Sequence, residues 1–154
     1  MKIKFTRPTV YVSHPIRGST GDIEGNCKKA SAAARRLRRV FPEVDFYVPA
    51  EHDLTLQILT ADNRLSIDDI MYADLQVLAV CHGWMFYMFD ESAGSLIEWQ
   101  EANDMGLNLN NKDGCSPNVF LYDIEKVSYE KLRKDFANLV ADTKKRFRNH
   151  QERN

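Results

Sequence analysis

The sequence contains no apolar run that could cross a membrane and no cysteine pattern typical of a small fold that is cross-linked by disulfides. A membrane-spanning helix needs roughly 18 or more consecutive apolar residues, and no stretch of the chain approaches that length. Residues 1–5 are charged and lack the apolar segment and cleavage site of a signal peptide. The three cysteines, Cys27, Cys81 and Cys115, include no Cys-x-x-Cys pair, which disfavours a disulfide framework and a zinc site. We therefore expect a soluble, cytoplasmic protein with no membrane partner and no metal centre.

Neither sign of charge is in clear excess. Lys and Arg total 21, Asp and Glu total 22, and the net charge is -1, so bulk charge disfavours a polyanion binder. Repeats, low-complexity segments and interior linkers are also missing, and 154 residues of which 44% are hydrophobic suit one domain. We expect a single domain over 1–154, in which 108–154 form a C-terminal strand–helix extension.

Short apolar strands alternate with helical segments along the chain. We expect strands at 9–13, 44–49, 75–81 and 118–122. We expect helices at 22–41, 54–72, 92–105 and 132–147. The segment 75–81 is the most apolar of the expected strands, which suits a buried central position. The alternation predicts an α/β three-layer sandwich, flavodoxin- or Rossmann-like, with a mainly parallel sheet of about four or five strands and ligands at the carboxyl ends of the strands.

The loop after the first strand has residue types that suit a phosphate. Exposed amides at the start of the following helix, the guanidinium of Arg17 and the hydroxyls of Ser19 and Thr20 would contact it. The loop lacks the Gly-Lys-Ser/Thr ending of a P-loop. The alternative is an ordinary turn whose hydroxyls cap the helix.

A second group of candidates opens the helix that follows the apolar strand. Ser92 suits the N-cap position, and Gly94 permits close approach of a ligand. Glu98 lies within two turns of that start, on a face that it shares with Ala102. A carboxylate in an otherwise apolar stripe is either a solvated surface residue or a functional group.

Four motifs stand in a characteristic order along residues 8–107. They are Tyr11-Val12-Ser13-His14-Pro15-Ile16-Arg17-Gly18, the segment 73–80, His82-Gly83-Trp84, and Ser92-x-Gly94-x-x-x-Glu98. In this order they resemble the opening strand and loop, the central strand and the catalytic segment of the nucleoside 2-deoxyribosyltransferase-like superfamily. The resemblance implies cleavage of the N-glycosidic bond of a nucleoside or nucleotide, without a cofactor.

The resemblance also implies a role for Glu98 and a substrate class. It makes Glu98 the nucleophile at the anomeric carbon, where a carboxylate can stabilise an oxocarbenium-like transition state and then bond covalently. Members that hydrolyse nucleoside 5′-monophosphates have an Ile-Arg-Gly loop like residues 16–18 and a serine like Ser92. We therefore expect a nucleoside monophosphate whose phosphate meets Arg17, Gly18, Ser19 and Ser92.

Other members of the superfamily transfer deoxyribose between bases of free nucleosides, which is the alternative activity. The superfamily commonly forms homodimers or larger assemblies, so the resemblance also implies a homo-oligomer.

The resemblance breaks at the second catalytic carboxylate. The family places an aspartate eight residues before the position of Asp74, where this chain has Ser66. Asp69, on the same helical face, would take over the protonation or orientation of the leaving base, with Asp68 as the second choice. If neither carboxylate reaches the pocket, the alternative is a catalytically degenerate protein that binds nucleotides or nucleic acid.

Aromatic residues leave further alternatives open. Trp84 and the aromatic residues that follow it would form a lid that stacks on the base, or else pack in the fold or against a second copy. Tyr11 would contact the base or sugar, or lie in the core. His14 would donate to a phosphate, or be exposed.

Basic residues cluster on the first expected helix. They are Lys28, Lys29, Arg35, Arg36, Arg38 and Arg39. No acidic residue lies between 25 and 42, so this helix could form a surface for nucleic acid. A solvated outer face is the favoured interpretation, and nucleic acid is not an expected partner.

Overall fold

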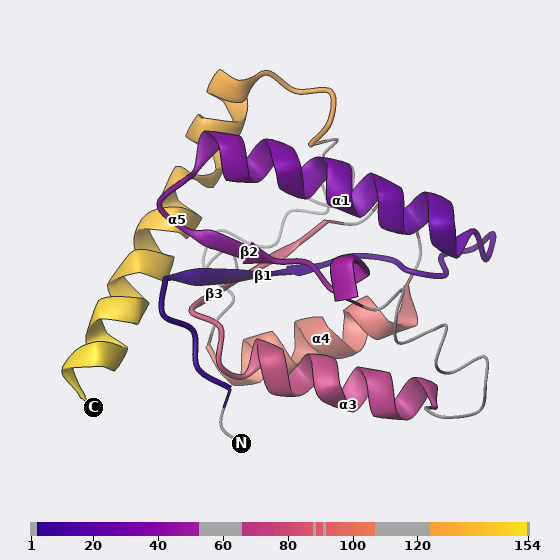
Figure 1. The fold of residues 1–154 in the computed structure, drawn as a ribbon, viewed down its shortest axis with the longest axis horizontal. Helices are drawn as coiled ribbons and strands as arrows, with labels where there is room; N and C mark the ends of the chain where they lie inside the picture. Colours follow the sequence, from indigo (N-terminus) through magenta and orange to yellow (C-terminus); the bar gives the residue numbers. More distant parts are fainter. Residues whose placement is uncertain (1–2, 53–65, 88, 91, 107–123, 154) are drawn as a thin grey trace.

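Three short parallel strands form the centre of the molecule, in the order β2-β1-β3 (Figure 1). The strands are β1 (Thr9–Ser13), β2 (Asp45–Tyr47) and β3 (Gly83–Phe86). The computed structural model describes residues 3–52, 66–87, 89–90, 92–106 and 124–153 of the chain. Every residue of β1 and β3 is buried, because helices cover both faces of this parallel sheet.

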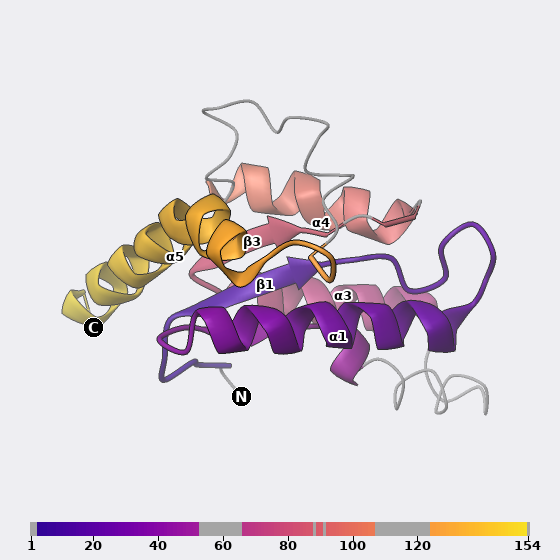
Figure 2. The ribbon, with the colours of Figure 1, turned by 90° about the horizontal axis from the view of Figure 1, so that it is seen from above.

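Helices cover the two faces of the sheet in pairs. The pair on one face is α1 (Ile23–Val40) and α5 (Tyr129–Glu152), and the pair on the other is α3 (Ile67–Leu78) and α4 (Ala93–Asp104) (Figures 1 and 2). Side chains alternate along β1, so Val10 and Val12 pack beneath α1 while Tyr11 packs on the side of α3 and α4. These layers confirm the predicted α/β fold with a parallel sheet.

Side chains cap the first turns of α1, α3 and α4. Asp22 accepts a hydrogen bond from the backbone N–H of Gly25, and Ser92 caps α4 as the sequence predicts. At the start of α3, the side chains of Ser66 and Asp69 each accept a hydrogen bond from the backbone N–H of the other, which is a capping box. These caps set where each helix begins relative to the sheet edge.

The strand predicted at 75–81 is wrong. Residues 75–78 are the last turn of α3, a short turn follows, and the third strand is Gly83–Phe86. Ile70, Asp74 and Leu78 are buried at a spacing of four residues, which is the helical period. The apolar run looked like a strand because a buried helix and a buried strand are equally apolar over so short a stretch.

The described residues contain three strands, whereas the sequence analysis expected about four or five. The strand expected at 118–122 and residues 54–65 of an expected helix lie outside the described residues. β1, β2, α1 and α4 lie within about two residues of their expected ends, whereas α3 ends six residues later than expected and α5 is longer than expected at both ends. Among the described residues, no helix is both long enough and apolar enough to cross a membrane.

Candidate functional site

A cavity of about 750 Å³ opens at the carboxyl end of β1. Its walls come from the loop after β1, one side of α3 and the first two turns of α4. Ligand sites in proteins typically have volumes of roughly 300–1,000 Å³, so the cavity can hold a small organic molecule. It also lies at the sheet edge where ligands bind in folds with parallel strands. This edge is the one that the sequence predicts.

Glu98 is the buried carboxylate of this cavity, with 4% of its surface exposed. The hydroxyl of Tyr11 donates a hydrogen bond to Oε1 of Glu98 at 2.5 Å. The hydroxyl of Ser13 donates to Oε2 of the same carboxylate. Two charge-assisted hydrogen bonds therefore hold both oxygens in one orientation. A solvated surface glutamate, which was the alternative, does not fit this burial.

Tyr11 and Ser13 reach the same carboxylate because they lie two residues apart on one face of β1. Tyr11 is fully buried, and its ring stacks on that of Tyr47 with the centroids 5.6 Å apart. It is therefore a core residue that positions Glu98, and it does not line the cavity. Sequence reasoning missed Ser13, although its place two residues after Tyr11 was a usable signal.

The three aspartates of α3 differ in their burial and in whether they line the cavity. Asp74 is buried and lines the cavity, and Asp68 lines it from the first turn of the helix. Asp69 is exposed, does not line the cavity, and accepts hydrogen bonds from the backbone N–H and the hydroxyl of Ser66 at 2.9 and 2.8 Å. These bonds lower the pKa of Asp69. Asp69 therefore serves the helix start, and Asp74 is the buried carboxylate that sequence reasoning missed.

The predicted phosphate loop reaches the cavity in part. Arg17 and Gly18 line it, and the Arg17 side chain makes no hydrogen bond or ion pair with the residues that the structure describes. Ser19 instead donates its backbone N–H and its hydroxyl to Oδ2 of Asp90, at 2.7 and 3.1 Å. Gly18 has φ +58°, and a Cβ there would lie 2.2 Å from the same Asp90 oxygen. An internal carboxylate thus occupies the donors that Ser19 would offer to a phosphate.

His14 is buried, so the alternative that left it exposed is wrong. Its Nε2 accepts a hydrogen bond from the backbone N–H of Ala50 at 3.0 Å, which leaves the proton on Nδ1, 3.0 Å from the carbonyl of Pro15. Burial lowers the pKa of His14 to about 4, so the ring is neutral at neutral pH. Although the ring lines the cavity, both nitrogens bind backbone, and His14 has no free donor for a phosphate.

Ser92, Gly94 and Ser95 bring the start of α4 to the cavity. The Ser92 hydroxyl accepts a hydrogen bond from the N–H of Ser95 at 3.1 Å. A Cβ at Gly94 would lie 2.8 Å from the terminal methyl of Met71, so the glycine lets α3 and α4 approach each other. The Ser95 hydroxyl, which sequence reasoning missed, is buried and has no hydrogen-bond partner among the described residues.

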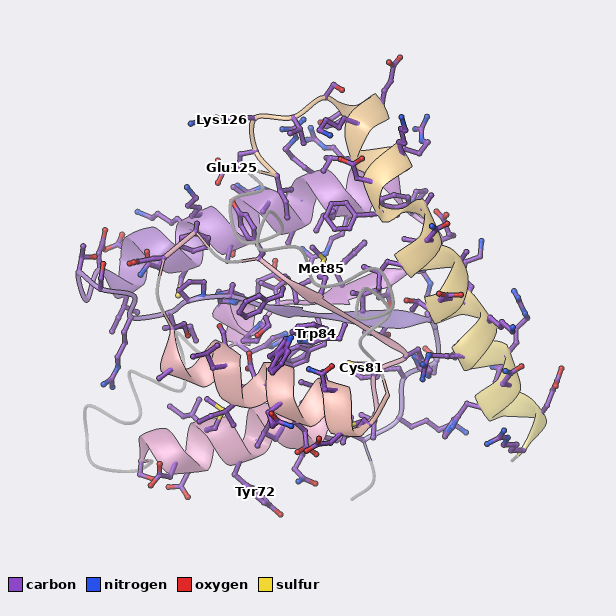
Figure 3. All side chains as sticks on the ribbon, turned by 180° about the vertical axis from the view of Figure 1, so that it is seen from behind. Tyr72, Cys81, Trp84, Met85, Glu125 and Lys126 are labelled. Atoms are coloured by element: carbon purple, nitrogen blue, oxygen red, sulfur yellow. The ribbon has the colours of Figure 1, made fainter. Side chains whose placement is uncertain are left out.

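Trp84 is not part of a lid over the cavity. It lies in β3 with 3% of its surface exposed, between the sheet and α4 (Figure 3). Its ring stacks on that of Phe86, with the centroids 5.6 Å apart. The lid alternative required these aromatic residues to lie in a loop, but residues 83–86 form β3. The alternative in which these aromatic side chains pack in the fold is confirmed for Trp84 and Phe86.

Three of the six cations of α1 make ion pairs or multiple hydrogen bonds within the protein. Lys28 pairs with Glu24 at 2.6 Å, and Arg38 pairs with Glu51 at 2.6 Å. Arg36 donates to three backbone carbonyls between residues 124 and 127, which attaches that segment to α1. These contacts within the protein favour the solvated outer face over a surface for nucleic acid.

The fold and the cavity together define an α/β domain with a buried, hydroxyl-bonded glutamate at the carboxyl edge of a parallel sheet. Comparisons with protein-family models, with curated proteins and with solved structures found no match.

Proposed function

We propose that the protein hydrolyses the N-glycosidic bond of a ribonucleoside or deoxyribonucleoside 5′-monophosphate, with Glu98 as the nucleophile. The observation that carries the proposal is the fixed carboxylate of Glu98 in a cavity of nucleotide size. A carboxylate with both oxygens held by hydroxyl donors is oriented before the substrate arrives, which lowers the entropic cost of attack. The order of motifs that resembles nucleoside deoxyribosyltransferases supports the same chemistry.

The reaction follows from the chemistry of a carboxylate at an anomeric carbon. An oxygen of Glu98 attacks that carbon as the bond to the base breaks, and the bonding electrons leave with the base. An acid protonates the base, and a glycosyl ester of Glu98 remains. Water then attacks the same carbon, loses a proton to a base, and releases sugar 5-phosphate with the Glu98 carboxylate restored.

Asp74 is the group that we assign to proton transfer with the base. It is buried and lines the cavity with Glu98, whereas Asp69 faces solvent. The position of β3 supports this assignment. Because the third strand is Gly83–Phe86, the residue directly before it is His82, and the residue eight positions before His82 is Asp74. The spacing that pointed to Ser66 therefore points to Asp74 once the strand is placed correctly.

Arg17 is the group that we assign to the 5′-phosphate. Its guanidinium lines the cavity and makes no hydrogen bond or ion pair with the described part of the chain, so it can bind an anion without losing another contact. The carboxylate of Asp90, which accepts a hydrogen bond from Ser19, would repel an anion bound beside Arg17. That contact favours the second candidate function, transfer between free nucleosides, whose 5′-hydroxyl carries no charge.

Assembly as a homodimer is part of the proposal. Tyr72 on α3 and Leu96 and Ile97 on α4 are large apolar side chains with between 49% and 66% of their surface exposed. Ile97 also lines the cavity, and Tyr72 points away from the body of the molecule (Figure 3). Such residues are suited to contact a second copy near the mouth of the site.

A panel of nucleosides and nucleoside monophosphates tests the proposal, with free base measured by chromatography. Base release from monophosphates alone supports the hydrolase. Exchange of bases between nucleosides supports the transferase, and would replace the proposed reaction while keeping Glu98 as nucleophile. The Glu98→Gln variant is the control that excludes a contaminating activity. If no substrate releases base, the proposed function is wrong.

A further inference from the structure

A second cavity, of about 540 Å³, lies at the opposite end of the strands, where β1 and β3 begin. Its walls are the turn between α3 and β3, the end of α4, and the C-terminal turns of α5. Cys81, in that turn, lies on the side of the molecule along which α5 runs (Figure 3). The cavity shares no lining residue with the cavity of Glu98.

The wall that α5 contributes is cationic. Lys145, Arg146 and Arg153 line the cavity, and Asp142 is its one carboxylate among the described residues. Elsewhere on α5, Lys131 pairs with Asp135 at 2.8 Å. By contrast, the side chains of Lys145 and Arg153 make no hydrogen bond or ion pair within the described ranges, and Arg146 donates only to the carbonyl of Gly106. The cavity therefore carries positive charge that the described residues leave uncompensated.

His82 adds a fixed hydrogen-bond donor to this wall. It has 7% of its surface exposed, and its Nδ1 accepts a hydrogen bond from the backbone N–H of Thr9 at 3.2 Å. Because Nδ1 accepts this hydrogen bond, the ring carries its proton on Nε2. Burial and the neighbouring His150 lower the pKa of His82. No hydrogen bond of that N–H to the described residues is present. The ring of Phe147 packs edge-on at 5.0 Å and fixes the direction of the imidazole.

We propose that this second cavity binds a phosphate group, either as inorganic phosphate or as a phosphomonoester. Lys145 and Arg153 supply charge-assisted hydrogen bonds, and Nε2–H of His82 supplies a directional donor at the buried end. The volume exceeds that of a single phosphate and falls in the range of sites for small organic ligands, so the monoester is the better fit. The inference does not depend on the function proposed for Glu98.

The four histidine rings allow each site to be observed separately by nuclear magnetic resonance. His82 and His150 line the second cavity, His14 lines the cavity of Glu98, and His52 lines neither. The full chain is titrated with inorganic phosphate and, in a second arm, with ribose 5-phosphate, with chloride keeping the ionic strength constant. We expect saturable shifts of the His82 and His150 signals. Tighter binding in the second arm identifies a phosphomonoester as the ligand, and equal binding identifies phosphate itself.

Matched variants on α5 complete the test. Replacing Lys145 and Arg153 together with alanine should weaken binding by at least about tenfold, since each removes a charge-assisted contact. Replacing Lys144 and Arg148 together with alanine removes the same number of cations from α5 at positions that do not line the cavity, and it should leave the affinity unchanged. An equal loss in both variants would show that only net charge matters and would overturn the proposal.

Three results of the wild-type titration, which needs no variant to fold, would also overturn it. They are shifts confined to His14, shifts that chloride reproduces, and displacement of the phosphate by a DNA oligonucleotide at lower concentration. The last result would assign the surface to a nucleic acid.

Discussion

The two ends of one small sheet carry opposite charge. At the carboxyl end of the strands, the cavity is lined by three carboxylate residues and, among the described residues, one arginine or lysine, namely Asp68, Asp74, Glu98 and Arg17. At the amino end, the second cavity holds three cationic side chains and one carboxylate among the described residues. The layered fold accounts for this difference. The N-termini of α3 and α4 lie at the carboxyl end, where the helix dipole favours anions, and their C-termini lie at the other end, where it favours cations.

This comparison explains why the two sites would hold an anion in different ways. A nucleophilic or proton-donating carboxylate is easiest to bury near helix N-termini, which partly offset its charge. The helix ends that line the second cavity are the C-terminal ends of α3, α4 and α5, so in the described part of the chain an anion there must be held by side chains such as Lys145 and Arg153. Variants in the cavity of Glu98 should therefore change turnover, and variants in the second cavity should change phosphate binding there.

The largest expected effect comes from Glu98→Gln. The amide keeps the size of the side chain but can neither carry the charge nor form the glycosyl ester. Turnover should fall by at least about a thousand-fold, or about 4 kcal/mol of barrier. Steady-state kinetics on the substrate found in the panel measures the loss.

The matched control for this variant is Glu101→Gln. Glu101 lies one turn later on α4 and does not line the cavity, so turnover should stay at the wild-type level. Glu98 lies in an apolar stripe of the sequence, but in the structure the hydroxyls of Tyr11 and Ser13 both donate hydrogen bonds to it. An amide can bond to the same hydroxyls, so both variants should fold normally. Equal losses of turnover in the two variants would contradict the role of Glu98.

The next largest effect should follow Asp74→Asn. Loss of a general acid costs about a hundred-fold or more in turnover. The loss should nearly vanish for a nitrophenyl riboside 5-phosphate, whose leaving group needs no proton. Asp69→Asn is the comparison variant: it should weaken the capping box and lower the stability of α3 while activity persists. The reverse pattern would return the catalytic role to Asp69.

A smaller effect concerns the pH dependence of folding. The pKa of His14 is about 4 in the folded protein and near 6.5 when unfolded. Between pH 4 and 6.5, His14 binds more protons in the unfolded chain than in the folded protein, which favours unfolding. The contribution of the neutral His14 ring to the free energy of unfolding is therefore complete above pH 6.5 and is lost as the pH falls towards 4. The free energy of unfolding should drop by up to about 3 kcal/mol over that window.

Urea unfolding at a series of pH values measures this loss. A His14→Asn variant should show a flatter dependence than wild type, whatever its absolute stability. An unchanged slope in the variant would mean that other groups cause the pH dependence.

The smallest of these effects should follow Arg17→Ala. The KM for a nucleoside monophosphate should rise about ten- to a hundred-fold, as expected for one charge-assisted contact of about 1.5–3 kcal/mol. The KM for the matching nucleoside should change little. If both constants rise equally, Arg17 has a structural role and the phosphate assignment fails.

The sequence predicted the class of fold but misplaced one strand. β1 was readable because the run 9–13 alternates and stops before His14-Pro15. β3 was not predicted, because the apolar run at 75–78 indicated the third strand. Residues 75–78 instead form the last turn of α3. The signal that separates the two is the capping box of Ser66 and Asp69, which starts a helix long enough to include them.

The misplaced third strand also explains why one site residue was chosen wrongly from the sequence. Five predicted site residues line the cavity, because local helix and loop signals place them. They are Arg17, Gly18, Ser92, Gly94 and Glu98. The choice of Asp69 depended on the misplaced strand. The contact between Ser19 and Asp90 joins residues 71 positions apart, and no local pattern reveals it.

The most direct test of the central claim is mass spectrometry of the protein after reaction with a 2-fluoro sugar analogue of the nucleotide. The fluorine slows breakdown of a glycosyl ester, so the covalent intermediate should accumulate. We predict a mass increase equal to the fluorinated sugar phosphate on the peptide that contains Glu98, and none in the Glu98→Gln variant. An active wild-type enzyme that forms no adduct, or forms it on another peptide, would contradict the account.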